Sequence, residues 1–257
     1  FKVDVTLPAN HRAGDRLPAM FWFYPREFSD QESYDRTLRT TNRNRYPAQG
    51  VRSMELLTML GYAVVQPDAP ITGPAGRMND NYVHDLRNNL AAVIDLLDRE
   101  GIIDRDRLGV GGHSYGAFST VNAMVHTPFF KAGIAGDGAY NRTLTPLGFQ
   151  SERRDFWQAR ETYLGMSPFI YANNLTGALL MYHGMDDQNV RRRDRQHRIG
   201  HTVIHARAQR IGRESRLGRA GSGDLVLAQG HDGDAAGGGK VHDRGCRGAD
   251  APEPRDD

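Results

Sequence analysis

The sequence predicts an α/β domain with a mostly parallel sheet, and three observations point to it. Short, nearly continuous apolar runs recur along residues 1–190, as in strands that are buried on both faces. Helical patterns of apolar residues lie between these runs. A serine between glycines, Ser114, stands where one run passes into a helical pattern. Alternation of strands and helices is typical of a parallel sheet covered by helices.

Five apolar runs are expected to form the strands of this sheet. Most of them are bounded by glycine, proline or aspartate, which favour turns over continued strands. In such sheets the reacting groups gather beyond the carboxyl ends of the strands, so catalytic residues are expected just after these runs. In chain order the runs occupy residues 19–25, 61–68, 107–112, 132–138 and 177–184.

The expected helices are identified by apolar residues spaced three and four positions apart. The clearest pattern covers residues 81–100 and is followed by Gly101, a residue type that commonly ends helices. A shorter pattern at 53–61 ends in Gly61, and a third follows the glycine-flanked serine. Together with the five runs, these patterns give the strand–helix alternation of an α/β domain.

Residues 112–116 read Gly-His-Ser-Tyr-Gly, which matches the pattern G-x-S-x-G. Glycines on both sides allow a tight, strained turn that lifts the Ser114 hydroxyl clear of the sheet. The following helix aims its first amides at the same point, so the Tyr115 N–H is placed to stabilise an oxyanion. Ser114 is therefore the candidate nucleophile of an acyl transfer. The alternative is a glycine-rich turn with an incidental serine.

A serine nucleophile of this kind needs a histidine base and a carboxylate that orients it. Asp186 and Asp187 lie just past the run at 177–184, and Asp137 lies at the end of the preceding run. Each of the three aspartates has the alternative role of a turn or capping residue. Spacing alone leaves the choice among them open.

Three segments carry a family resemblance: "GGHSYGAF", "GDGAYNRTLTPLGFQ" and "HGMDDQNV". Together they resemble the catalytic domain of the prolyl oligopeptidase family of serine peptidases, and "AYNRTLTPLGFQ" is most similar to its glutamyl endopeptidase branch. The resemblance covers about residues 1–190. It implies an α/β-hydrolase fold with helices on both faces of the sheet. The family pattern H-G-x-x-D-x-x-V implies that Asp187 is the acid and Val190 the matching valine.

The resemblance also implies residues that bind the substrate. Tyr24 would give a second oxyanion donor beside the Tyr115 N–H; its alternative place is in the apolar core run "FWFY". The glutamyl branch implies cleavage after glutamate, which requires a cation, and arginine binds carboxylates through paired hydrogen bonds. Arg142, Arg153 and Arg154 are the candidates, and each has the alternative role of a surface arginine.

The implied function is a serine peptidase that hydrolyses peptide or protein substrates through an acyl-enzyme on Ser114. No metal or organic cofactor is implied. The alternatives are a carboxylesterase or lipase-like hydrolase and a noncatalytic peptide-binding remnant. The family implies an N-terminal β-propeller in the full-length protein, so this chain is expected to be a fragment. A net charge of +2 and the absence of a long apolar run argue against specific nucleic-acid or membrane partners. The cellular compartment stays open.

The composition changes abruptly near Val190. All 22 aromatic residues lie at or before Tyr182, whereas residues 191–257 contain none, with 13 arginines and 12 glycines. Such a segment cannot bury the apolar surface that offsets the entropy lost on folding. We expect an incomplete catalytic domain at 1–190 and an Arg/Gly-rich tail at 191–257 that is frameshifted or disordered. The tail offers no convincing catalytic histidine; His231 is a weak candidate.

The frameshift hypothesis makes a prediction about the encoding DNA. Residues 207–212, Arg-Ala-Gln-Arg-Ile-Gly, can be encoded by CGC-GCT-CAA-CGG-ATT-GGG. Read one base later, these codons give Ala-Leu-Asn-Gly-Leu-Gly, which resembles the family segment after the acid. We expect the next reading frame after the Val190 codon to encode a strand, a His-Gly loop and a closing helix. Sequencing the gene tests this, and a next frame without those features rejects a frameshift.

Overall fold

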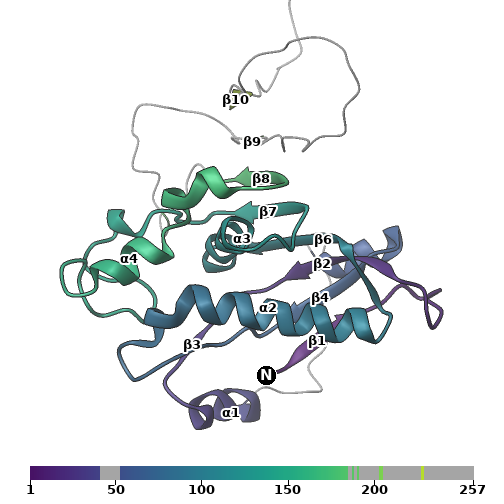
Figure 1. Cartoon of the computed structure of the whole chain (residues 1–257), viewed down its shortest axis with the longest axis horizontal. Coiled ribbons are helices and arrows are strands. Elements are labelled where there is room, and N and C mark those ends of the chain that lie inside the picture. Colours follow the sequence, from purple (N-terminus) through teal and green to yellow (C-terminus); the bar gives the residue numbers. More distant parts are fainter. Residues whose placement is uncertain (41–52, 185–186, 188–189, 191–202, 205–226, 229–257) are drawn as a thin grey trace, which may run out of the picture.

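The computed structural model describes residues 1–40, 53–184, 187, 190, 203–204 and 227–228. Its main element is a six-stranded sheet in which every neighbouring pair is parallel except the first. The predicted α/β class with a mostly parallel sheet is thus confirmed (Figure 1). The strands of this sheet are β1 (Val3–Thr6), β2 (Leu17–Trp22), β4 (Ala63–Pro67), β6 (Ile103–His113), β7 (Ala132–Gly136) and β8 (Ala178–Tyr182).

The strand order across the sheet is β1-β4-β2-β6-β7-β8, which puts β6 inside the sheet and β8 at one edge. All five predicted runs form strands, and β6 begins earlier than expected, at Ile103. The two-residue strands β3 (Glu27–Phe28) and β5 (Ile71–Thr72) pair with each other outside the main sheet. They were not predicted, because two residues carry no periodic pattern.

Two helices cover one face of the sheet: α2 (Tyr82–Arg99) and α3 (Tyr115–His126). The apolar stripe of α2 is buried, as its spacing predicted, and Gly101 ends it in a left-handed conformation. Helix α3 is buried on almost every side because it contacts β6, β7 and α2. The other helical segments are α1 (Gln31–Thr40), η1 (Met54–Leu60), η2 (Met78–Asn81), η3 (Arg142–Leu144), α4 (Arg160–Met166) and η4 (Pro168–Asn174).

The second face of the sheet is covered unevenly. Val64, which alternates with the core residues Ala63 and Val65 along β4, is also fully buried, and η1 contacts this strand. Along β8, by contrast, Leu179 is 5% exposed while its neighbour Leu180 is 36% exposed. Within the described residues, β8 is thus an edge strand with an apolar face open to solvent.

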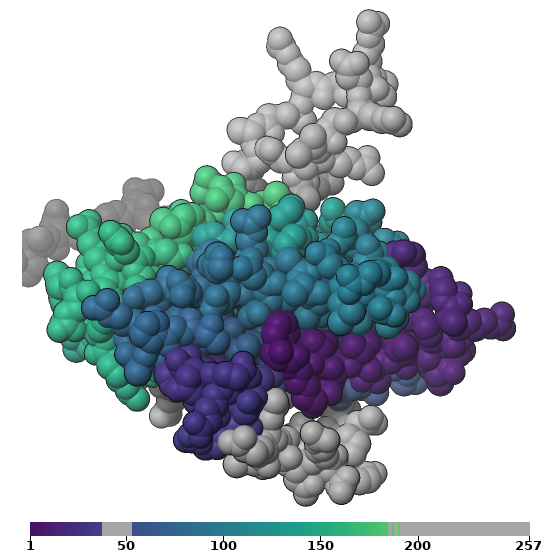
Figure 2. All heavy atoms as spheres, turned by 60° about the horizontal axis from the view of Figure 1, so that its bottom comes forward, coloured from purple at the N-terminus to yellow at the C-terminus, as the bar shows by residue number. Residues whose placement is uncertain are grey.

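The elements from β1 to β8 pack into one continuous body in the space-filling view (Figure 2). No helix in the described part of the chain is long and apolar enough to cross a membrane. Of the predicted tail, only β9 (Val203–Ile204) and β10 (Leu227–Ala228) are described, and they pair antiparallel. The rest of residues 191–257 lies outside the described residues, so the division at Val190 remains a prediction.

The uneven cover of β8 leads to a stability prediction. We expect Leu179→Ala to lower the free energy of unfolding by about 2–5 kcal/mol, because it leaves a cavity in the core. Leu180→Ala, on the open face, should cost less than about 1 kcal/mol. Urea unfolding of the two variants measures the difference. Equal losses would mean that something covers the open face in solution.

Candidate active site

Ser114 occupies the sharp turn between β6 and α3. Its backbone angles are φ 56° and ψ −116°, in a region that residues with a side chain rarely adopt. The Ser114 N–H donates a hydrogen bond of 2.8 Å to the Gly136 carbonyl at the end of β7. The Ser114 carbonyl accepts from the Phe118 N–H at 3.1 Å, which begins α3. The turn that G-x-S-x-G predicted is therefore present, with the serine between the sheet and the helix.

The two glycines of the motif are required by close packing. A Cβ atom on Gly112 would overlap the backbone of Gly116. A Cβ atom on Gly116 would overlap the carbonyl oxygen of Phe23. The serine turn therefore packs directly against the chain just beyond the end of β2, and this contact brings Tyr24 to the start of α3.

Two groups near Ser114 are suited to stabilising an oxyanion. Tyr115 is the first residue of α3, so its backbone N–H has no acceptor within the helix. Tyr24 lies two residues past β2 and is 45% exposed, which places it outside the buried apolar run. The centroid of its ring is 5.9 Å from that of Tyr115. Both predicted donors thus lie beside the same helix start.

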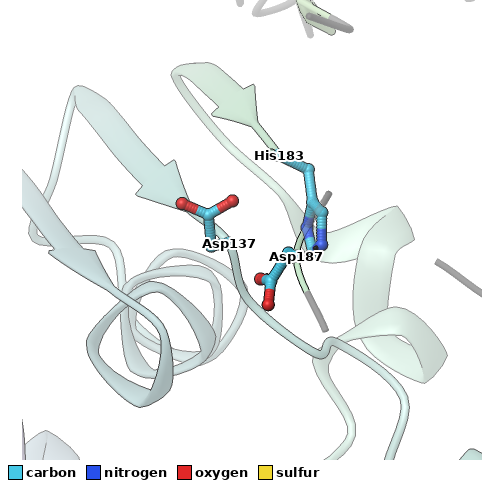
Figure 3. A group of neighbouring side chains, drawn as sticks. All are labelled: Asp137, His183 and Asp187. Atoms are coloured by element: carbon cyan, nitrogen blue, oxygen red, sulfur yellow. Dashed lines mark ion pairs between the residues drawn. The ribbon is translucent and has the colours of Figure 1, made fainter. Parts of the chain in front are cut away.

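Asp187 and Asp137 lie close together beyond the ends of β8 and β7 (Figure 3). One oxygen of Asp187, Oδ1, accepts a hydrogen bond of 3.0 Å from the Val190 N–H. The other, Oδ2, is 3.5 Å from Nε2 of His183. Asp186, the neighbouring candidate, lies outside the described residues. His183 is the histidine of the pattern H-G-x-x-D-x-x-V, four residues before Asp187, and its contact with the acid was not predicted.

Asp137 forms hydrogen bonds with the chain segment that leads from β8 to Asp187. Its backbone is left-handed, at φ 56°, and its N–H donates to the Tyr182 carbonyl at 2.9 Å. Its Oδ1 accepts from the Gly184 N–H at 2.6 Å, and its Oδ2 is 3.4 Å from Nδ1 of His113. The side chain of His113 is exposed. Asp137 thus connects the loop after β8 to the residue that precedes the nucleophile.

The group Asp137, His183 and Asp187 could also be considered as a metal site, because its ligand atoms lie within 4.8 Å of one another. Each member, however, has a partner in the chain. The Nε2 atom of His183 is 2.8 Å from the Val190 carbonyl, which can only accept, so Nε2 carries the proton. Both carboxylates accept backbone N–H groups. These hydrogen bonds explain why the three side chains lie together without a metal ion: they hold the loop that carries Asp187.

Arg142, on η3, is a buried cation beside the nucleophile turn. It is 6% exposed, and its guanidinium carbon lies 4.0 Å from the ring centroid of Phe118 and 5.4 Å from that of Tyr115. Burial lowers the pKa of this guanidinium from its ordinary value. Its Nε has no hydrogen-bond partner among the described residues. Aromatic faces rather than a carboxylate therefore hold the charge.

The other two arginine candidates have different surroundings. Arg154 forms ion pairs of 2.7 Å with Glu152 and 2.6 Å with Asp80, and these raise the pKa of its guanidinium. Arg153 is exposed. Of the three predicted arginines, Arg142 is the one whose guanidinium lies over the ring of Tyr115, the residue after Ser114.

Sequence reasoning missed Glu27, on β3. Its carboxylate is largely buried beside Tyr115, and Oε2 accepts a hydrogen bond of 3.3 Å from the Ser151 hydroxyl. Burial raises the pKa of Glu27, while the Tyr115 hydroxyl, Ser151 and the charge of Arg142 partly oppose that shift. The weak candidate for the base, His231, lies outside the described residues.

A family model described as the prolyl oligopeptidase family matches residues 50–194. The chain is also 42% identical over 176 residues to a probable chloroplastic glutamyl endopeptidase of Oryza sativa subsp. japonica. The corresponding protein of Arabidopsis thaliana is 41% identical over the same length. Each match covers 67% of this chain but only 19% and 18% of the plant proteins, so the chain spans about a fifth of their length.

Two solved structures are similar in fold. The dipeptidyl peptidase 4 of Porphyromonas gingivalis matches with a TM-score of 0.56 and 21% identity, over 74% of this chain and 26% of that one. The acylaminoacyl peptidase of Pyrococcus horikoshii matches with a TM-score of 0.50 and 21% identity, over 71% and 29%. The predicted α/β-hydrolase fold is thereby confirmed.

The packing around Ser114 predicts that Gly116→Ala lowers the free energy of unfolding by about 1–3 kcal/mol, since the added methyl group meets backbone. Gly165→Ala is the matched control, because a Cβ atom there meets nothing within 4 Å and the site lies in α4. It should stabilise the chain by roughly 0.5–1 kcal/mol. Urea unfolding measures both changes. A Gly116→Ala chain as stable as the control would show that the turn is not closely packed.

Proposed function

Because the chain belongs to the prolyl oligopeptidase family, we propose that residues 1–190 form a serine peptidase catalytic domain with Ser114 as its nucleophile. The observation that carries this proposal is the left-handed backbone of Ser114 at the junction of β6 and α3. Such a turn costs conformational energy and leaves the hydroxyl clear of the sheet, which a purely structural serine does not require.

The proposed reaction is acyl transfer to Ser114. The serine oxygen bonds to the carbonyl carbon of a peptide while its proton passes to a histidine base. The N–H of Tyr115 and the hydroxyl of Tyr24 donate to the oxyanion. The histidine then protonates the leaving amine as the C–N bond breaks, and water hydrolyses the acyl-enzyme. Asp187 orients the imidazole and stabilises its charge.

The proposed substrate is a peptide with an acidic residue before the cleaved bond. The plant relatives are named as probable glutamyl endopeptidases, and Arg142 places a positive charge 5.4 Å from the ring of the residue after the nucleophile. A desolvated guanidinium without a carboxylate partner favours binding of a substrate carboxylate. Arg154 is already saturated by Glu152 and Asp80, and Arg153 is exposed. This leaves Arg142 as the best candidate.

The proposal also includes the segments on either side of this domain: the one that should supply the histidine base and the N-terminal β-propeller. In the family order Ser, Asp, His, the base follows Asp187, and residues 191–257 contain no histidine in a convincing setting. We therefore expect the chain as it stands to be impaired in the acyl-transfer step. The N-terminal β-propeller of the full-length protein remains part of the proposal.

Labelling with a fluorophosphonate, which reacts with activated serines, tests the proposed function. The chain restored in the next frame after Val190 should label rapidly at Ser114 and cleave peptides in preference to simple esters. Asp187→Asn in that chain should lower the rate by about 10³–10⁴-fold. The chain as it stands should label far more slowly. Ser114→Ala is the control that removes labelling.

Rapid labelling of Ser114 in the chain as it stands would show that one of its own histidines serves as the base. Labelling that survives Ser114→Ala, or a restored chain that hydrolyses only esters, would contradict the proposed peptidase.

A further inference from the structure

Asp137 has an unfavourable position that the proposed reaction does not explain. Its backbone is left-handed, at φ 56°, which costs energy for a residue with a side chain. Its side chain is only 16% exposed. A carboxylate oxygen of Asp137 and one of Asp187 lie within 4.8 Å of each other, so two negative charges are held close together. Strained residues of this kind persist where the surrounding structure and a functional role require them.

One set of contacts joins Asp137 to the segment that carries the acid. We call the described residues His183, Gly184, Asp187 and Val190 the acid loop. The Oδ1 atom of Asp137 accepts the Gly184 N–H at 2.6 Å, and the Gly184 carbonyl accepts the Asp187 N–H at 3.3 Å. A Cβ atom built on Gly184 would lie 3.5 Å from Asp137 Oδ1 and 3.9 Å from the Asp187 Cβ. Gly184 is thus held between the two aspartates.

A second set of contacts joins Asp137 to the nucleophile turn. The carbonyl of Gly136, the residue before Asp137, accepts the Ser114 N–H at 2.8 Å. The Oδ2 atom of Asp137 is 3.4 Å from Nδ1 of His113, the residue before Ser114. Asp137 therefore contacts both the turn that carries the nucleophile and the loop that carries the acid.

We propose that Asp137 is a positioning residue that holds the acid loop, and with it the Asp187 carboxylate, in a fixed place relative to the nucleophile turn. This inference rests on the proposed function, in which Asp187 is the acid. The side chain of Asp137 acts through its oxygen, as the acceptor of the Gly184 N–H. A carboxylate makes this bond stronger than a neutral acceptor would, but an amide oxygen can also accept it.

Amide hydrogen exchange, followed by NMR on the chain as it stands, tests the proposal without turnover. Asp137→Gly removes the acceptor while it relieves the left-handed backbone. We expect it to speed exchange of the Gly184 N–H about ten- to hundredfold. The Val190 N–H, which donates to the Asp187 carboxylate, should exchange at least about threefold faster. The Ala178 N–H, hydrogen-bonded at the start of β8, is the reference and should keep its rate.

Two further variants separate the acceptor from the backbone. Asp137→Asn keeps an oxygen acceptor and tolerates the left-handed conformation, so it should speed exchange at Gly184 by less than about fivefold. Gln150→Gly relieves another left-handed residue, at φ 48°, and should leave exchange at Gly184 unchanged. An aspartate that merely stabilised the fold would, when replaced, speed exchange at Ala178 and Gly184 by the same factor.

A Gly184 N–H that exchanges freely in the unchanged chain overturns the proposal before any variant is made. Exchange in Asp137→Gly that rises equally at Ala178, or at Gly184 without Val190, also overturns it, as does an Asp137→Asn chain that exchanges as fast as Asp137→Gly. None of these rates depends on the chemistry of Ser114. Fluorophosphonate labelling that fails while this exchange pattern holds would reject the peptidase and leave the ordering of the acid loop by Asp137 intact.

Discussion

The left-handed backbone of Ser114 is the constraint on which the rest of the site depends. Holding a serine there costs about 1–3 kcal/mol, which the surrounding packing must supply. Gly112 and Gly116 remove the side chains that would prevent this packing, and the buried helix α3 fixes the direction in which the chain leaves the turn. The Phe23 carbonyl closes the turn from the side of β2. Strain at one residue is thus stabilised by contacts from two strands and a helix.

Backbone hydrogen bonds then align the neighbouring loops with that turn. The Ser114 N–H donates to the Gly136 carbonyl, and the N–H of the residue after Gly136, Asp137, donates to the Tyr182 carbonyl. The Asp137 carboxylate also accepts from the Gly184 N–H. Because β6, β7 and β8 are parallel neighbours, their carboxyl ends form one row, and the acid loop is positioned relative to the nucleophile by main-chain geometry. Arg142 is positioned differently, by stacking on aromatic rings, and among the described residues no carboxylate forms an ion pair with its guanidinium.

A structural feature could be predicted from the sequence when residues close together in the chain determine it, and could not when tertiary packing does. The strands and α2 were predictable because runs and periodic spacings of apolar residues can be read from consecutive positions. Ser114 was predictable because its two glycines stand only two positions before and after it. The choice of Asp187 over Asp137 needed the family resemblance, since both follow strands. The burial of Arg142 was not predictable, because Phe118 and Phe149 reach it only through tertiary packing. Glu27 had no sequence signal, since β3 is two residues long.

The open strand β8 has a consequence for how such a chain would fare in a cell. Within the described residues β9 lies near this strand, but no strand is hydrogen-bonded to its outer edge, and Leu180 and Tyr182 are each 36% exposed. Exposed backbone next to apolar side chains is what chaperones retain and what seeds aggregation in incompletely folded proteins. The nucleophile turn can thus be well formed while chaperones and proteases remove the molecule that carries it. The cellular abundance of the chain would then depend more on its degradation than on its synthesis.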